Sequence, residues 1–472
     1  MFIGRERELA SLKEFYEKDR IGMIVIYGRR RIGKSTLITE FVKDKKTIFY
    51  TATKVGKHRN LELFSRQVLD VLMPGVENIS FNTTEAVFDF IDKNIGDEKL
   101  VLVIDELPYW AEKDDALLSI LQKYIDTVWN NKKLKIILCG SSLSFMEQKV
   151  LSEKSPLFGR RDSQMKLEAF NYLDSAKFVS DYSNEDKAIC YGITGGVAKY
   201  LSMIDSAKSM DENIIRLFFR TDGYLYDETR NLLTQEFADV SVVNNIVEQI
   251  ASGGNTLNTI AGKIGEKEQT VLYSLDKLIS VGLIEKKKCI TDEKNKKKTQ
   301  YVLKDYMFKF WYEFIPKATS VIEMGQGEIY YKKAVKPVLH SFMGSVFEEM
   351  CRYYTLMKGI MGEYGCFITS VGTWWGVENV RDKNGEIRSQ SADIDVVALS
   401  ETDKKAVVGE CKFKNEKIDK GIYETLIRRG KLINAKYEVT KYIFFSLSGY
   451  TDWFAELADE DVLLLTLDSL YE

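Results

Sequence analysis

Residues 28–36, GRRRIGKST, contain glycines, a lysine and a hydroxyl group at a spacing that suits phosphate binding. Gly28, Gly33, Lys34 and Ser35 fit the spacing GxxxxGK[ST] without a mismatch, between an apolar run typical of a strand and a segment typical of a helix. Glycines let the loop turn its backbone N–H groups inward, and the next helix N-terminus adds partial positive charge, so the loop can hold phosphate oxygens. The alternative is a chance match in a glycine-containing turn.

This loop predicts a nucleoside-triphosphate site that works with Mg²⁺. We expect Lys34 to reach the outer phosphates as a point charge and Ser35 to ligate the ion. The residues expected to surround the phosphates are Gly28, Arg29, Arg30, Arg31, Ile32, Gly33, Lys34, Ser35 and Thr36.

Two carboxylates follow an apolar run at residues 99–110, KLVLVIDELPYW. A continuous apolar run predicts a strand of a buried parallel sheet, whose carboxyl end faces the ligand crevice. We expect Asp105 to hold Mg²⁺ through water and Glu106 to orient and deprotonate the attacking water. The alternative is that the strand simply ends in acidic residues, as many strands do.

Two further candidates come later in this region. Residues 134–145, LKIILCGSSLSF, predict another buried strand, after which Ser142 would sense the outermost phosphate; the alternative is an ordinary turn. Arg160 follows the loop PLFGR and is placed to act as an arginine finger on a neighbouring subunit's nucleotide. It could equally be a surface salt-bridge residue.

A second constellation lies in the last part of the chain. Asp395 stands inside the apolar run of one predicted strand, and Glu410 and Lys412 stand two apart on the next, so they share a face. Burying these charges is costly unless they pair with one another or hold a metal. Two carboxylates and a backbone carbonyl suit Mg²⁺ or Mn²⁺, and the lysine would stabilise a hydroxide that attacks a phosphate. The alternative is an internal salt bridge between strands.

The composition indicates a cytosolic globular protein of several domains. A chain of 472 residues predicts roughly three domains, and 45% hydrophobic with 29% charged residues is an ordinary balance. Because the net charge is −3, nucleic-acid contact would need a local basic patch. The 6 Cys form no CxxC pair and indicate reduced thiols, and 2 His argue against a His-based metal site. Without a signal peptide or long apolar run, we expect a cytoplasmic protein with no membrane association.

The segments between the two constellations read as helical. Residues 171–235 predict a small lid with a glycine-rich turn, GITGGVAKYL. Residues 243–305 predict three helices and a charged hairpin, the order of a winged helix, with lysines at 286–288 and in the run 294–298 on or beside the wing. These lysines could contact DNA, or the module could only bridge domains.

Several motifs together resemble the archaeal-type ATPase family, which is related to AAA+ and STAND ATPases. They are FIGRE, GRRRIGKST, VLVIDELPYW, ILCGSS, PLFGRR and YGITGGVAKYL. The family's usual proline after the glycine pair is Ala198 here. The C-terminal motifs GSVFEE, TWW, DIDVVAL and GECKF resemble the domain that accompanies this family, which is similar to PD-(D/E)XK nucleases. That likeness implies Glu348 as the helix acid, Asp395 as the metal acid and Glu410-x-Lys412 as the (D/E)xK pair.

The resemblance implies an α/β multidomain chain. Its expected domains are a P-loop ATPase core with a parallel sheet (1–170), a helical lid (171–235), a winged helix (236–318) and a mixed-sheet, restriction-endonuclease-like domain (319–472). We expect an ATP-hydrolysing switch coupled to metal-dependent cleavage of DNA or RNA, active as a homo-oligomer. Two alternatives stay open: a nucleic-acid-binding regulator that does not cut, and a protein-interaction switch whose C-terminal charges are structural.

Overall fold

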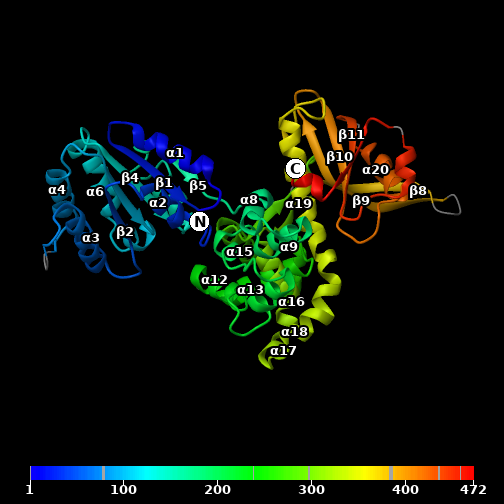
Figure 1. Cartoon of the computed structure of the whole chain (residues 1–472), viewed down its shortest axis with the longest axis horizontal. Coiled ribbons are helices and arrows are strands. Elements are labelled where there is room, and N and C mark those ends of the chain that lie inside the picture. The colour runs from blue at the N-terminus through cyan, green and yellow to red at the C-terminus, as the bar shows by residue number, and fades with distance from the viewer. Residues whose placement is uncertain are drawn as a thin grey trace. The chain divides into compact units, whose positions relative to one another are not determined.

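The computed structural model describes residues 2–76, 80–237, 239–295, 298–381, 386–433, 436–457 and 459–472. The chain forms two compact units (Figure 1). The first unit runs up to Phe178 and also includes Gly196–Met203, whereas the second comprises Val179–Gly195 and Ile204–Glu472. The second unit therefore interrupts the first, because the chain crosses between them three times.

The first unit contains a five-stranded parallel sheet in the order β2-β3-β4-β1-β5. Its strands are β1 (Gly22–Tyr27), β2 (Thr47–Thr51), β3 (Leu100–Asp105), β4 (Leu134–Gly140) and β5 (Ser163–Lys166). β1, β3 and β4 are buried along their whole length, as their uninterrupted apolar sequences predict. Since all strands run the same way, the loops that follow β1, β3 and β4 meet at one edge of the sheet. The prediction of a parallel sheet is confirmed.

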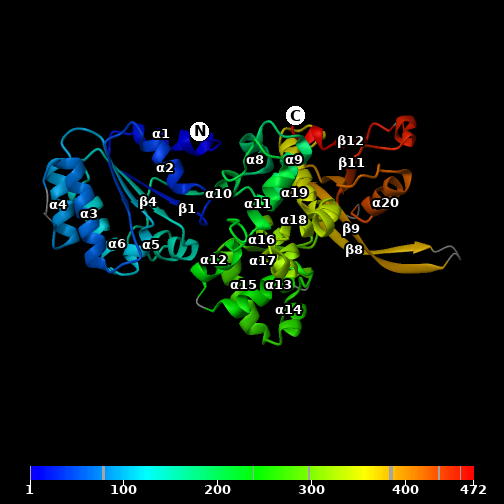
Figure 2. The same cartoon turned by 60° about the horizontal axis from the view of Figure 1, so that its bottom comes forward.

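Helices cover both faces of this sheet (Figure 2). Alternate residues of β1 face opposite layers: Ile24 and Ile26 belong to one buried cluster, and Met23 and Val25 belong to the other. The first cluster is completed by α1 (Glu6–Glu17) and α2 (Lys34–Val42), and the second by α3 (Lys57–Leu72), α4 (Thr84–Asn94), α5 (Leu107–Ala111) and α6 (Leu117–Lys123). Short helices α7 (Leu143–Phe145), α8 (Tyr172–Ala176) and α10 (Ala198–Leu201) complete the unit.

The second unit begins with helices. They are α9 (Asn184–Thr194), α11 (Met210–Phe218), α12 (Glu228–Glu236), α13 (Val240–Ala251), α14 (Leu257–Ile264), α15 (Glu268–Ser280), α16 (Tyr306–Phe314), α17 (Thr319–Glu323) and α18 (Gly327–Tyr330). Between α15 and α16, the strands β6 (Ile284–Lys287) and β7 (Gln300–Leu303) form an antiparallel hairpin. We call residues 240–303 the helix–hairpin segment. Its element order is the one expected for a winged helix.

The hairpin's lysines are partly engaged with neighbouring acids. Lys286 Nζ lies 3.0 Å from Asp276 on α15, and Lys298 Nζ lies 3.2 Å from Asp292. The predicted wing lysines at 296 and 297 lie outside the described residues. DNA contact by these lysines stays a prediction.

The second unit ends in a mixed five-stranded sheet in the order β12-β11-β10-β9-β8. β8 (Ser370–Arg381), β9 (Ile387–Ser400) and β10 (Lys405–Lys412) are antiparallel neighbours, whereas β11 (Glu438–Ser446) and β12 (Val462–Thr466) run parallel to β10. Before the sheet comes the long helix α19 (Leu339–Ile360), and α20 (Lys420–Gly430) connects β10 to β11. A separate C-terminal domain with a mixed sheet is confirmed.

The four predicted domain ranges stay predictions. The compact units divide the range predicted as a lid, because Gly196–Met203 groups with the N-terminal unit. Among the described residues, no helix combines the length and the apolar composition needed to cross a bilayer.

Candidate nucleotide and carboxylate sites

The predicted phosphate loop lies between β1 and α2, as expected. Gly28 has φ +153°, and a Cβ there would lie 2.4 Å from the Leu167 carbonyl oxygen; Gly33 has φ +91°. Both positions therefore require glycine. Lys34 is the first residue of α2 and is buried, and its Nζ donates to the carbonyl oxygens of Gly28 and Arg29, at 3.0 Å each. The ammonium thus lies across the loop that would enclose the phosphates.

The remaining loop residues are held from two sides. Arg5 stacks its guanidinium 4.3 Å from the centre of the Phe170 ring and donates to the Ile32 carbonyl at 3.4 Å. The Lys199 N–H, on α10, donates to the Arg31 carbonyl at 3.1 Å. Elsewhere in the motif, Arg30 donates to the Tyr109 hydroxyl at 2.7 Å, and Thr36 is exposed on the first turn of α2.

Asp105 at the end of β3 and Ser35 on the first turn of α2 are brought together. Asp105 is buried at the end of β3, and its Oδ2 accepts a hydrogen bond from Ser35 Oγ at 2.7 Å. Its second oxygen accepts from the Glu106 N–H at 3.0 Å. Burial and the nearby Asp105 charge raise the pKa of the Cys139 thiol. A hydroxyl beside a carboxylate at a phosphate loop suits Mg²⁺, which usually keeps several waters.

Glu106 has φ +51°, which is a strained backbone conformation for a residue with a Cβ. Its carboxylate accepts from both the N–H and the hydroxyl of Ser141, at 3.2 and 2.7 Å. Ser141 was missed by the sequence reasoning, which chose its neighbour. Ser142 instead accepts from the Phe145 N–H at 3.4 Å and caps α7, and its phosphate-sensing role stays a prediction.

Arg160 is engaged within the chain. Its Nε and Nη2 donate to the Asp126 carboxylate at distances of 2.9 to 3.2 Å. This is the ion pair that the alternative interpretation expected. The finger role stays a prediction, and it would require this pair to open.

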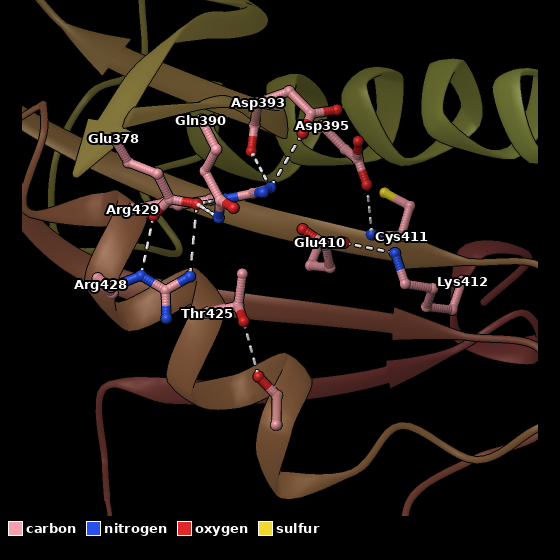
Figure 3. A network of polar contacts seen from close by, with 11 residues as sticks. Glu378, Gln390, Asp393, Asp395, Glu410, Cys411, Lys412, Thr425, Arg428 and Arg429 are labelled. Atoms are coloured by element: carbon pink, nitrogen blue, oxygen red, sulfur yellow. Dashed lines mark hydrogen bonds and ion pairs between the residues drawn. The ribbon is translucent and has the colours of Figure 1, made fainter. Parts of the chain in front are cut away.

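The acids of the second constellation converge at adjacent strands (Figure 3). Asp395 on β9 accepts from the Cys411 N–H of β10 at 3.0 Å, and Glu410 pairs with Lys412. Burial, followed by the charges of Glu410 and Glu348, raises the pKa of Asp395 to about 7. Burial opposes the charge of Lys412, but Glu410 outweighs it and raises the pKa of the lysine. The strands therefore concentrate negative charge at one point.

Glu348 approaches this point from α19, where its Oε2 accepts from Arg352 Nη1 at 3.3 Å. Within the described ranges, no group of three or more His, Cys, Asp or Glu side chains is arranged to hold a metal ion. A cation would therefore rest on Asp395 and Glu410 with a backbone carbonyl or waters, a donor set that fits Mg²⁺ or Mn²⁺.

A second polar network connects β9 with β8 and α20 (Figure 3). Glu378 on β8 is 2% exposed, and it receives hydrogen bonds from Arg428 and Arg429 of α20 and from Gln390 of β9. Arg429 also pairs with Asp393 at 2.9 Å. The sequence reasoning missed this network because its members come from three elements and form no local motif.

Comparison with known proteins gives one family match in the N-terminal part of the chain and one in the C-terminal part. Residues 2–204 match the family described as an ATPase domain predominantly from Archaea, and residues 311–422 match a family described as archaeal and bacterial proteins of unknown function. An uncharacterized protein of Methanocaldococcus jannaschii is 31% identical over 437 residues, which cover 92% of each chain. An uncharacterized ATP-binding protein of the same archaeon is 25% identical over 250 residues, covering 43% of this chain and 69% of that one.

The solved structure of a Walker-type ATPase of Pyrococcus abyssi covers 66% of this chain and 96% of its own, with 18% identity and a TM-score of 0.50. At this identity the likeness concerns the fold. The P-loop geometry, the parallel sheet and the family match agree that the N-terminal unit is an ATP-binding ATPase domain. The chain belongs to the family that joins this archaeal ATPase domain to a C-terminal domain of unknown function.

Proposed function

We propose that the protein is an ATP-hydrolysing switch coupled to a C-terminal domain that cleaves nucleic acid with a divalent metal. The observation that carries the nuclease part is the convergence of Asp395, Glu410 and Lys412 on adjacent strands, with Glu348 facing them from α19. The order helix, three antiparallel strands, helix and parallel strand supports the likeness to PD-(D/E)XK nucleases.

For ATP hydrolysis we assign one role to each polar residue of the N-terminal site. Lys34 would bind the outer phosphates, Ser35 and Asp105 would hold Mg²⁺, and Glu106 would deprotonate the attacking water. Ser141 holds the Glu106 carboxylate, so that bond would have to open before Glu106 could act.

The ATPase assignment is tested with two variants. Lys34→Ala is expected to lose ATP binding, measured by calorimetry, because the phosphates lose their point charge. Glu106→Gln is expected to bind ATP and fail to release phosphate, because an amide cannot accept the proton. Normal turnover by Glu106→Gln would remove Glu106 as the base.

For phosphodiester cleavage, Asp395 and Glu410 would hold Mg²⁺ or Mn²⁺, which would supply Lewis-acid stabilisation of the developing charge. Lys412 would stabilise the attacking hydroxide, and Glu348 would support the site from the helix. The proposed substrate is DNA or RNA, which the helix–hairpin segment would contact.

The cleavage assignment is tested by incubating the full chain with DNA and with RNA, plus Mg²⁺ or Mn²⁺. Lys412→Ala is expected to reduce the yield of metal-dependent product at least about tenfold. Lys414→Ala, at an exposed position nearby, is expected to leave the yield unchanged. If no product depends on both the metal and Lys412, the chain does not cleave by this site.

A non-cleaving switch is the second candidate. It is favoured by the internal pairing of Glu410 with Lys412 and by the lack of a three-ligand metal group in the described part of the chain. In that case Asp395→Ala would leave nucleic acid binding intact, and Mn²⁺ would not raise the melting temperature.

Oligomerisation is part of the proposal. Arg160 would leave Asp126 and reach a neighbouring subunit's nucleotide. Size-exclusion chromatography with ATP should show a larger species for the wild type, and ATP turnover by Arg160→Ala should then fall at high protein concentration only.

A further inference from the structure

The strand β9 contains a bulge opposite Thr373 of β8. On one side of it, Gly372 pairs with Val397 of β9, whereas on the other side Trp374 pairs with Ile394. Two residues of β9 therefore lie opposite one residue of β8, and the backbone ladder is locally open. The backbone groups at this position can therefore form hydrogen bonds with residues outside the sheet.

Asp395 is one of the two β9 residues that form the bulge. On the other side of β9, the pairing with β10 ends at Val396 opposite Gly409, so it does not include the adjacent Asp395. Arg352 of α19 donates a hydrogen bond from its Nη1 to the Asp395 carbonyl oxygen at 2.8 Å. The Arg352 side chain thus holds the backbone of Asp395, the candidate metal ligand, at a position where neither neighbouring strand pairs with it.

Arg352 is almost completely engaged. Its side chain is 11% exposed, and besides the Asp395 carbonyl it contacts Glu348 at 3.3 Å, Glu349 at 2.9 Å and the Thr373 hydroxyl at 3.2 Å. The planar guanidinium holds several acceptors in fixed directions, which a flexible ammonium would not do. One side chain therefore links two candidate site acids with Thr373 of β8.

Thr373, opposite the bulge, is joined in turn to the helix–hairpin segment. We call residues 284–290 the wing segment. The Ile290 N–H donates to the Thr373 carbonyl at 3.1 Å, and Cys289 forms a parallel bridge with Thr373. Ile290 also packs against the hydrophobic cluster of the C-terminal sheet, and a Cβ at Gly372 would lie 3.2 Å from its Cβ.

We propose that Arg352 and Thr373 are positioning residues of the carboxylate site, and that the wing segment is built into the framework that holds them. A displacement of the helix–hairpin segment would move Thr373, release Arg352 and reorient Asp395 and Glu348. The wing segment is therefore the element through which the rest of the chain regulates this site. This inference rests on the proposed metal-dependent function of the C-terminal domain.

The experiment measures Mn²⁺ affinity of the full chain by calorimetry without nucleotide, and Asp395→Asn identifies the heat that belongs to the C-terminal site. Thr373→Val removes the hydroxyl that Arg352 contacts but keeps the side chain's shape and is at least as favourable in a strand. We expect it to weaken Mn²⁺ binding about tenfold, and Thr373→Ser to restore the affinity. Thr369→Val is the matched control, because that hydroxyl bonds the Leu399 carbonyl instead.

A second variant tests the wing segment. Ile290→Ala removes packing of the wing segment without changing Arg352 or an acid, and we expect a similar loss of Mn²⁺ affinity. Ile387→Ala, at an exposed position, should cause no loss.

A purely structural role of Thr373 predicts that the valine variant binds Mn²⁺ as well as the serine variant, and that result would overturn the inference. If Ile290→Ala and the wild type bind Mn²⁺ with equal affinity, the proposed role of the wing segment is wrong. If the wild type has no Asp395-dependent Mn²⁺ heat, the proposed metal function fails first, and the inference falls with it.

Discussion

At the scale of single residues, a buried carboxylate is kept charged by the arginines that reach it. Hydrogen bonding from Arg428, with Gln390 and Arg429 also contributing, lowers the pKa of Glu378 from 4.5 to about 2 despite burial. Because the folded state holds the charged form more tightly than the unfolded chain does, Glu378 stabilises the fold fully above about pH 4.5. This contribution decreases as the pH falls from there through about 2.

We therefore expect Glu378→Gln to lower the free energy of unfolding of the C-terminal domain by about 2 kcal/mol at pH 7, and by much less at pH 3. Urea unfolding at the two pH values measures the difference. The exposed Glu416→Gln serves as the control. An equal loss at both pH values would show that packing, and not charge, makes Glu378 important.

At the scale of elements, the turn before α10 is shaped by glycine. Gly196 has φ +68°, and a Cβ there would lie 2.0 Å from the Phe170 carbonyl oxygen. The Phe170 N–H donates to the Gly196 carbonyl at 2.8 Å, so the two backbones are in direct contact. This contact places α10 against the phosphate loop, where Lys199 meets Arg31.

Gly196→Ala should cost about 3 kcal/mol or more in the stability of the N-terminal unit, because a methyl group adds backbone overlap to the strain of the left-handed conformation. Gly96→Ala is the control, since Gly96 also has a positive φ, +60°, but has open space around it. Its expected cost is about 1 kcal/mol. Denaturant unfolding compares the two, and equal losses would mean that Phe170 moves aside without cost.

At the scale of the whole molecule, the chain forms two compact units, and the proposed ATP site lies in the first. A ligand that binds the folded state stabilises it by mass action, by about 2.7 kcal/mol at a hundredfold excess over Kd. The proposed switch requires that this stabilisation also changes the second unit, where the wing segment lies.

Hydrogen exchange with and without ATP and Mg²⁺ tests this requirement. Amides at residues 28–36 and 105–106 are expected to exchange more slowly with ATP, and those at 284–290 are expected to change their rate, while Lys34→Ala abolishes both effects. Protection confined to the first unit would mean that the chain binds ATP without acting as a switch.

Much of the chemistry could be predicted from the sequence because it depends on neighbours in the chain. The phosphate loop requires only glycines, a lysine and a serine at fixed spacing between a strand and a helix, and the structure has that strand–loop–helix order. The apolar run ending in Asp105 likewise predicted both a buried strand and the edge of the sheet at which the acid lies.

Which side chains meet across elements depends on the packing of the folded chain. Two adjacent serines follow β4, and the local pattern did not distinguish Ser141, which holds Glu106, from Ser142, which caps a helix. Arg352 contacts Asp395 because a bulge in β9 leaves that backbone without a strand partner. Such contacts depend on strand register and helix packing between residues far apart in the chain, and no local spacing encodes them.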